Sequence, residues 1–583
     1  MTASPPTENA KIAYFSMEIA LDPEIPTYSG GLGVLSGDTI RSAADLGLPM
    51  VAVTLAHRKG YFHQNLDALG NQSELPSAWR PEDRLEEMEG SVQIVIEQRH
   101  VHVRAWRLKI TGVGGDSVPV YLLDTACPEN DAWDRTLTDS LYGGDRRYRL
   151  CQEAVLGIGG VRILRRLGHR NISIFHMNEG HAALLTLALL EERVGSSDLG
   201  SAKERDIEEV RKQCVFTTHT PVPAGHDQFT RDLLRGVLGA ERAAALDVTH
   251  CCPDNQLNMT FLGLRFSHYI NGVAMRHGDV SRDMFPAYPV RAITNGVHAV
   301  TWTSRPFQEL YDQHIPEWRR DNEYLRYVIG ISTDDIGRAH KTAKAVMLDR
   351  IQTTAGIALR PDVLTIGFAR RAAAYKRFDL IFTDTARLRE LADRIGPLQI
   401  VFAGKAHPQD EPGKAQIRRV FEQAAHLNNE WIKILYLEDY GIPLGSVLTS
   451  GVDLWLNTPQ QPYEASGTSG MKAALNGVPS LSILDGWWIE GCLEGVTGWS
   501  IGKSGDVSAP AGDEAASLYS KLGEIMAMFY QRPTEYQEVM RTAIAINGSF
   551  FHTQRMVEQY MANAYFPAEP IPITPPAKES FPS

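Results

Sequence analysis

Two series of short apolar runs constrain the fold of this chain more than any other feature of its sequence. Each run has the length and composition of a buried β-strand, and segments with helical periodicity separate most of the runs. Strands that alternate with helices predict an α/β protein with largely parallel sheets. The runs of the first half are Ile12–Phe15, Met50–Leu55, Val118–Leu123, Ile172–His176 and Val215–Thr218. Those of the second half are Val363–Phe368, Gln399–Ala403, Ile432–Leu437 and Val452–Asn457.

The two series predict two Rossmann-like, doubly wound units. A chain of 583 residues is too long to build a single core. The segment Asn295–His298 has turn chemistry, so we place the boundary between an N-terminal unit of residues 1–293 and a C-terminal unit of residues 294–583. The tail after Phe566 is rich in proline and is expected to be poorly ordered. Ligands of such sheets bind beyond the carboxyl ends of the strands, which predicts a cleft between the two units.

The charge and the cysteines of the chain argue against several classes of partner. A formal net charge of −12 at pH 7 disfavours binding to nucleic acid. The six cysteines show no C-x-x-C spacing, which favours free thiols in a reducing compartment over disulfides or a metal cage. No apolar run reaches the roughly 18 residues that a membrane-spanning helix needs. No secretory signal is visible at the start, so we expect a cytoplasmic protein without a metal.

The segment Glu464–Gly477 is the most informative for chemistry. It follows a predicted strand and opens a helix, and its glycines allow a ligand to approach the backbone closely. A helix start of this kind attracts phosphate. Lys472 lies about one turn inside the helix, which suits a Schiff base with pyridoxal phosphate. A turn of small residues with a surface lysine is the alternative. The hydroxyls and amides on offer belong to Ser466, Gly467, Thr468, Ser469 and Gly470.

Three other segments carry polar residues at strand ends. The stretch Phe368–Arg377 holds four cations, which indicates phosphate binding or, alternatively, a solvated helix start. The glycine turn Ser29–Gly33 offers backbone amides to an anion. The side chains of a further group suit sugar hydroxyls, although a purely structural role is equally open for each. That group is Glu179, His181, His219 and Asn295.

Taken together, these segments resemble the α-glucan phosphorylase family, which includes glycogen, starch and maltodextrin phosphorylases. The resemblance runs through most of Ala10–Gly486 and is strongest at Glu464–Gly477, which is similar to the long signature E-A-S-G-T-x-x-M-K-x-x-x-N-G. Ala403–Ala406 and Tyr375–Arg377 also match. The resemblance implies two Rossmann-like domains around a cleft, the glycosyltransferase B arrangement, in a compact enzyme of bacterial or archaeal type. It also implies a homodimer.

The resemblance further implies which residues bind the cofactor and the substrates. Lys472 would carry pyridoxal phosphate, and Arg371 and Lys376 would bind the substrate phosphate and the cofactor phosphate. The remaining cofactor contacts would be Gly467, Thr468, Ser469 and Tyr440. The remaining contacts to the substrate phosphate or the glucosyl unit would be Gly31, Leu32, His219, Asn295, Tyr375, Glu464 and Ser466.

The implied reaction is the phosphorolysis of terminal α-1,4-linked glucose from glycogen, starch or maltodextrin to give α-glucose 1-phosphate. A cofactor phosphate, with a second pKa near ~6, suits proton exchange with the substrate phosphate. The substrate phosphate would protonate the glycosidic oxygen and attack the sugar on the same face, which retains the α configuration. Because two phosphates repel each other, Arg371, Lys376 and helix-start amides would have to offset their charge.

The chain departs from the family pattern at a few positions. Arg370-Arg371 stands for the usual Lys-Arg pair, and Ala373-Ala374 stands for His-Glu. Gly441 occupies a position where an arginine for the cofactor phosphate is common, and Arg370 is the candidate to replace it.

Two other functions remain as alternatives. A nucleotide-sugar glucan synthase would carry a second glutamate eight positions after Glu464 and a lysine in the glycine turn, where this chain has Lys472 and Tyr28. A non-catalytic glucan-binding scaffold would account for Gly441, but the presence of Arg371 and Lys472 argues against it. Both comparisons favour the phosphorylase.

Overall fold

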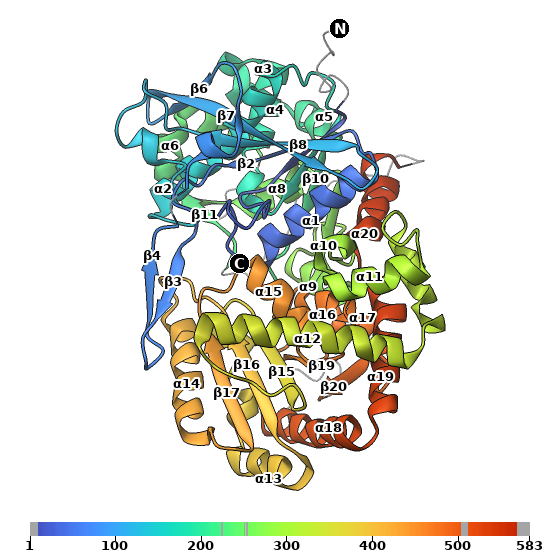
Figure 1. Cartoon of the computed structure of the whole chain (residues 1–583). Coiled ribbons are helices and arrows are strands. Elements are labelled where there is room, and N and C mark those ends of the chain that lie inside the picture. The colour runs from blue at the N-terminus through green and yellow to red at the C-terminus, as the bar shows by residue number, and fades with distance from the viewer. Residues whose placement is uncertain are drawn as a thin grey trace.

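The computed structural model describes residues 10–77, 79–222, 225–249, 251, 255–502 and 511–567. Within these residues the chain forms two large sheets, which are largely parallel and lie one above the other in Figure 1. The predicted α/β class with parallel sheets is therefore confirmed. From residue 568 onward, the tail that the sequence predicts to be poorly ordered lies outside the described residues.

The first sheet comes from the N-terminal half of the chain. Its order is β14-β13-β10-β9-β1-β2-β8-β7-β5, with β6 paired to β7. The strands of its parallel part are β1 (Ile12–Phe15), β2 (Met50–Leu55), β8 (Ser117–Asp124), β9 (Ile174–Asn178), β10 (Cys214–Thr217), β13 (Tyr269–Gly272) and β14 (Arg291–Ala292). The antiparallel edge consists of β5 (Glu86–Glu87), β6 (Val92–Ile96) and β7 (Arg99–Thr111). All five predicted runs form parallel strands here, because a strand covered on both faces must be apolar throughout.

The second sheet comes from the C-terminal half and is entirely parallel. Its order is β17-β16-β15-β18-β19-β20. The strands are β15 (Leu364–Ala369), β16 (Leu398–Ala403), β17 (Ile432–Leu437), β18 (Leu454–Asn457), β19 (Ser480–Ile483) and β20 (Gly498–Ile501). The sequence predicted the first four. It missed β19 and β20, whose serines and terminal glycine interrupt the apolar pattern.

Helices cover the faces of both sheets and fill the region between them. Figure 1 shows α1, α15 and α16 in that region, and the long α12 along the upper side of the second sheet. The helices used below are α1 (Gly31–Asp45), α2 (Arg146–Ala154), α10 (Ala299–Trp302), α12 (Thr333–Ala355), α14 (Glu411–Leu427), α15 (Ile442–Gly451), α16 (Ser469–Ala474) and α18 (Ala511–Gln531).

The end of the described chain returns to the first sheet. Helix α20 (Thr553–Tyr560) packs against α1, and the Ser42 and Thr553 hydroxyls are 2.6 Å apart. The Tyr565 hydroxyl lies 2.7 Å from His176 of β9. Residues distant in sequence therefore share one core around β9, a contact that the apolar pattern does not reveal. The division between residues 293 and 294 stays a prediction.

A hairpin reaches from the first half of the chain to the second sheet. It consists of β3 (His63–Leu66) and β4 (Gln72–Leu75), and Figure 1 shows it beside α14. In the described ranges, no helix is both long and apolar enough to span a membrane. The same part of the chain holds no group of three or more His, Cys, Asp or Glu residues that could bind a metal ion.

Candidate active site

The predicted site residues lie at the points where the strand orders of the two sheets reverse. In the first sheet the order reverses between β1 and β9, and in the second between β15 and β18. A crevice forms at such a point, because the connections from the two strands leave towards opposite faces. Glu179 directly follows β9, and Arg370 and Arg371 directly follow β15. The topology thus brings the basic stretch and the polar strand ends to ligand-binding edges.

The glycine turn before α1 is held by Glu18, which follows β1. One carboxylate oxygen of Glu18 accepts hydrogen bonds from the Ser29 and Gly30 amides at 2.6 and 3.2 Å. The other accepts one from the Tyr142 hydroxyl at 2.8 Å. The amides of Gly31 and Leu32, at the start of α1, donate to no group of the described residues. This leaves the amino end of α1 available to an anion, as predicted for Gly31.

Glu179 and His219 lie side by side after β9 and β10. The Glu179 carboxylate accepts hydrogen bonds from the His219 amide at 2.7 Å and from the Thr220 hydroxyl at 3.0 Å. Burial raises the pKa of Glu179 to about 7. The His219 ring bonds to the Asn178 side chain at 2.6 Å, and burial lowers its pKa to about 3. His219 is therefore a neutral hydrogen-bonding group, which suits a sugar hydroxyl better than a charged phosphate.

His181 and Asn295 have different surroundings. His181 lies 3.4 Å from Asp227, which also pairs with the half-buried Arg149, and its ring centre lies 5.8 Å from that of Tyr142. The Asn295 backbone is bonded to Val273 and Arg555, whereas its buried side-chain oxygen has no partner among the described residues. An unsatisfied buried acceptor is costly, which makes the Asn295 side chain a candidate ligand contact.

Glu464 forms a buried ion cluster with two cations. Its carboxylate lies 2.8 Å from Lys376 Nζ and also pairs with Arg370, which in turn contacts Asn457 of β18. Burial alone would raise the pKa of Glu464, but the charges of Arg370 and Lys376 outweigh it and lower the pKa to about 2. The residue predicted to hold a sugar hydroxyl thus also neutralises a residue predicted to bind phosphate.

Arg371 and Tyr375 lie next to this cluster. Arg371 is exposed and forms no ion pair with the described residues. Lys376 Nζ lies 4.4 Å from the centre of the Tyr375 ring. Burial raises the pKa of the Tyr375 hydroxyl, but the charges of Lys376 and Arg371 outweigh burial and lower it. Arg371 is therefore a free cation in the crevice, as a phosphate-binding residue has to be.

Lys472 points its amine into a buried aromatic environment. Its Nζ atom lies 3.6 Å from the centre of the Trp302 ring, and the Trp302 indole donates a 2.7 Å hydrogen bond to Asp38 of α1. Burial lowers the pKa of Lys472 to about 8, against the opposing charge of Asp38. A fraction of the amine is thus unprotonated and nucleophilic near neutral pH.

The turn before α16 presents free backbone amides. Gly467 has a φ of +82°, which lets the chain turn sharply without a side-chain clash. The amides of Gly467, Thr468 and Ser469 donate to no described group, and the Ser469 hydroxyl accepts from the Trp455 indole at 3.1 Å. The buried Ser466 hydroxyl is also without a described partner. These donors surround the position from which Lys472 projects.

Tyr440 and Gly441 precede α15. The Tyr440 side chain packs against a cluster that includes Ala473 of α16, and burial raises the pKa of its hydroxyl. The Tyr28 hydroxyl accepts a 3.0 Å hydrogen bond from the Ile442 amide, and a side chain at Gly441 would come within 3.2 Å of that hydroxyl. Gly441, a departure from the family pattern, and Tyr28, which stands where a glucan synthase would carry a lysine, are therefore neighbours in space.

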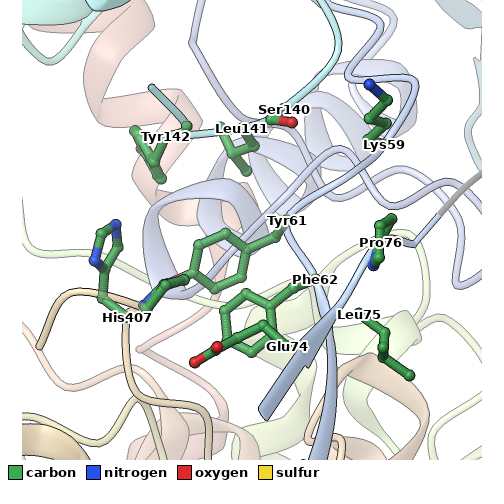
Figure 2. A pocket seen from close by; sticks show the side chains of 12 residues that line it. Lys59, Tyr61, Phe62, Glu74, Leu75, Pro76, Ser140, Leu141, Tyr142 and His407 are labelled. Atoms are coloured by element: carbon green, nitrogen blue, oxygen red, sulfur yellow. The ribbon is translucent and has the colours of Figure 1, made fainter. Parts of the chain in front are cut away.

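A pocket of about 260 Å³ lies near Arg371. Figure 2 shows the Tyr61 and His407 rings lining it, and their centres are 6.2 Å apart. The charge of Arg371 acts on both: it opposes the rise in pKa that burial causes at Tyr61, and it adds to the fall that burial causes at His407. The lining residues are Lys59, Tyr61, Phe62, Glu74, Leu75, Pro76, Ser140, Leu141, Tyr142, Gly143, His407 and Pro408.

Comparison with known proteins identifies the family of this chain. Residues 226–494 match the sequence model of the carbohydrate phosphorylases. The maltodextrin phosphorylase of Thermococcus litoralis is 37% identical over 95% of this chain and 70% of its own length. The chain belongs to the carbohydrate phosphorylase family. The glycogen phosphorylases of Mycobacterium bovis and Aquifex aeolicus are 36% and 33% identical over 96% of this chain, and over 71% and 86% of their own lengths.

Membership in the carbohydrate phosphorylases confirms the predicted resemblance. It assigns to the protein the predicted reaction class, the phosphorolysis of an α-glucan by a glycosyltransferase. The structure has features that fit the pyridoxal phosphate of this family. Lys472 supplies a buried amine, Ser466 an unsatisfied hydroxyl, and Arg370 an Nε atom without a described partner.

Several residues of this phosphorylase site were not among the predicted ones. Asp38 and Trp302 lie against Lys472, and Tyr142 holds Glu18. Asp38 lies seven positions after Gly31 in α1, about two helical turns, so helical spacing indicates that both share a face. Trp302 and Tyr142 carry no sequence signal of their own, since single aromatic residues mostly pack in cores.

Proposed function

We propose that the protein catalyses the phosphorolysis of terminal α-1,4-linked glucose from an α-glucan, with retention, using pyridoxal phosphate bound to Lys472. The observation that carries the proposal is the Lys472 amine, which is buried against Trp302 and has its pKa lowered to about 8. A lysine with no acceptor near it costs stability, and covalent attachment of a cofactor removes that cost. Free amides of Gly467 and Thr468 lie one helical turn away, where a phosphate would be bound.

When bound, pyridoxal phosphate supplies a phosphate group that exchanges a proton near neutral pH. Arg371 and the free amides of Gly31 and Leu32 bind the attacking phosphate and offset its charge. Lys376 pairs with Glu464 and also helps to offset the charge of the phosphates. Gly441 offers no cation to the cofactor phosphate, and Arg370 supplies that charge instead.

The glucosyl unit lies between the two reversal points. Glu464, His219 and Asn295 bind its hydroxyls, and Tyr375 lines the same space. A neutral His219 and the free Asn295 oxygen distinguish this pocket from the cationic phosphate site beside it. We place the next part of the glucan chain in the pocket of Figure 2, where Tyr61 offers an aromatic face for a sugar ring.

We also propose that the enzyme acts in the cytoplasm. The described cysteines Cys127, Cys151, Cys214 and Cys492 are free, which supports a reducing compartment.

The test is the formation of α-glucose 1-phosphate from glycogen, soluble starch and maltodextrins by the purified holoenzyme. Product that requires both inorganic phosphate and the cofactor supports the proposal, and Lys472→Ala is expected to abolish it. Glucan elongation from a nucleotide sugar would support a synthase instead. Glucan binding without turnover, in protein with cofactor on Lys472, would support the scaffold.

A further inference from the structure

The hairpin of β3 and β4 docks on two loops at the ligand-binding edge of the second sheet. One loop follows β16 and includes Gly404 and Ala406; the other follows β17 and includes Asp439. Gln72 makes a paired contact with the Ala406 backbone, accepting from its amide at 3.0 Å and donating to its carbonyl at 2.9 Å. The hairpin, which lies beside α14 in Figure 1, is therefore fixed to the second half of the chain by specific contacts with its backbone.

Gln64 makes the corresponding contact with the other loop. Its side chain is fully buried, accepts a 2.9 Å hydrogen bond from the Asp439 amide and donates one of 2.9 Å to the Gly404 carbonyl. The Gln64 amide donates to the Asp439 carboxylate at 3.1 Å. The carboxylate also pairs with His63 at 2.7 Å and Lys405 at 2.6 Å. Hairpin residues thus contact both the backbone and the side chain of Asp439.

Asp439 has a backbone conformation that needs such support. Its φ is +55°, in the left-handed region that residues with a Cβ atom adopt rarely, although aspartate and asparagine do so more often than others. A conformation of this kind persists where surrounding contacts determine it, and such positions gather at functional sites. Asp439 directly precedes Tyr440, whose side chain packs against the apolar cluster that includes Ala473, the neighbour of Lys472 in α16. The conformation of Asp439 therefore sets the direction in which Tyr440 leaves the loop.

We propose that Gln64 is a positioning residue of the active site: by holding Asp439, it orients Tyr440 beside the cofactor. The inference rests on the proposed function, in which pyridoxal phosphate is bound to Lys472, and on the cofactor contact that the family resemblance implies for Tyr440. No contact with a substrate or the cofactor is assigned to Gln64. Its effect passes from the hairpin through one strained residue to Tyr440, across the two halves of the chain.

The test compares Gln64→Ala with Gln72→Ala in the full-length protein. The two glutamines belong to the same hairpin, and the Gln64 side chain donates a 2.8 Å hydrogen bond to that of Gln72. Gln72→Ala removes this bond and the contact with Ala406 but leaves the contacts of Gln64 with Asp439, so the comparison isolates those contacts. Hydrogen exchange of the Asp439 amide is measured first, in protein freed of cofactor. The rate at which the holoenzyme loses its cofactor on dilution, and the visible absorbance of the bound cofactor, are measured next.

We expect Gln64→Ala to speed both exchange at Asp439 and loss of cofactor by about ten-fold and to shift the absorbance, whereas Gln72→Ala changes each rate by less than about two-fold. Equal effects of the two variants would show that the hairpin only holds the two halves of the chain together. That result would overturn the proposal. Faster exchange in Gln64→Ala with unchanged retention and absorbance of the cofactor would also overturn it. A wild-type protein that binds no cofactor would contradict the proposed function instead, while the exchange data would still report on Gln64 and Asp439.

Discussion

Lys376 Nζ lies 2.8 Å from both carboxylate oxygens of Glu464. The pair joins a residue proposed for phosphate binding to one proposed for sugar binding, and Arg370 completes the cluster. Two buried cations around one carboxylate leave one positive charge in excess. That excess charge, together with the free Arg371, makes the crevice a binding site for an anion.

The first prediction concerns this excess charge. Glu464→Gln leaves Arg370 and Lys376 buried without a carboxylate, and we expect it to lower the free energy of unfolding by about 3 kcal/mol. Inorganic phosphate then replaces the lost charge, so it should raise the melting temperature of the variant more than that of the wild type. Thermal unfolding with and without phosphate, at matched ionic strength, checks this.

Glu514→Gln is the matched control, since Glu514 pairs with Arg377 and, among the described ion pairs, with neither Arg370 nor Lys376. Phosphate should restore little of its lost stability. If phosphate stabilises both variants equally, the cation cluster is not the phosphate site.

The second prediction follows from the lowered pKa of Lys472. Burial sets that pKa at about 8, so half of the amine is unprotonated at this pH. The rate of cofactor attachment to the cofactor-free protein should therefore rise with pH and reach half of its maximum near pH 8, measured by absorbance. The charge of Asp38 raises the pKa, so Asp38→Asn should move this midpoint to lower pH. A midpoint near the ordinary lysine value of about 10.4 would contradict the environment described for Lys472.

The third prediction concerns the pocket of Figure 2. Tyr61→Ala removes the aromatic face that we assign to the glucan chain, and we expect the KM for maltodextrin to rise about ten-fold while the KM for phosphate stays unchanged. Initial rates of glucose 1-phosphate formation give both constants. Tyr327→Ala, at an exposed tyrosine outside the pocket, is the control and should change neither. An unchanged glucan KM in Tyr61→Ala would place the chain elsewhere.

The fourth prediction concerns the buried Glu179. Its folded pKa of about 7 lies above the unfolded value, so the folded protein binds the extra proton between about pH 4.5 and 7. Stability therefore falls as pH rises through this window. Glu179→Gln keeps an acceptor for the His219 amide but does not titrate, so its stability relative to wild type should increase by up to about 3 kcal/mol from pH 4.5 to 8. Urea unfolding across this range measures the difference, and a constant difference would show that the pKa of Glu179 is the same in the folded and unfolded states.

Most of the parallel strands could be predicted because strands buried on both faces must be apolar. The strands β19 and β20 were missed, since Ser480, Ser482 and Ser500 make them look like loops. The return of Tyr560 and Tyr565 to the first sheet also has no local signal, because it depends on contacts between residues far apart in sequence.

The candidate site likewise has a part that local sequence patterns predict and a part that they do not. Lys472 and its glycine turn, or Arg371 after β15, could be predicted because a helix start or a strand end fixes their surroundings locally. Other contacts of the site join segments that are far apart in the sequence. They are those of Glu464 with Lys376, Tyr28 with Ile442 and Gln64 with Asp439. Such contacts are consequences of how the two halves of the chain pack, and no periodicity in the sequence encodes them.

The most direct measurement of the central claim is to reduce the purified protein with borohydride, digest it, and locate any pyridoxyl adduct by mass spectrometry. The account predicts one adduct, on Lys472, in wild-type protein supplied with pyridoxal phosphate, and none in Lys472→Ala. An adduct on a different lysine, or none in wild-type protein that has been supplied with the cofactor, would contradict the role given to Lys472.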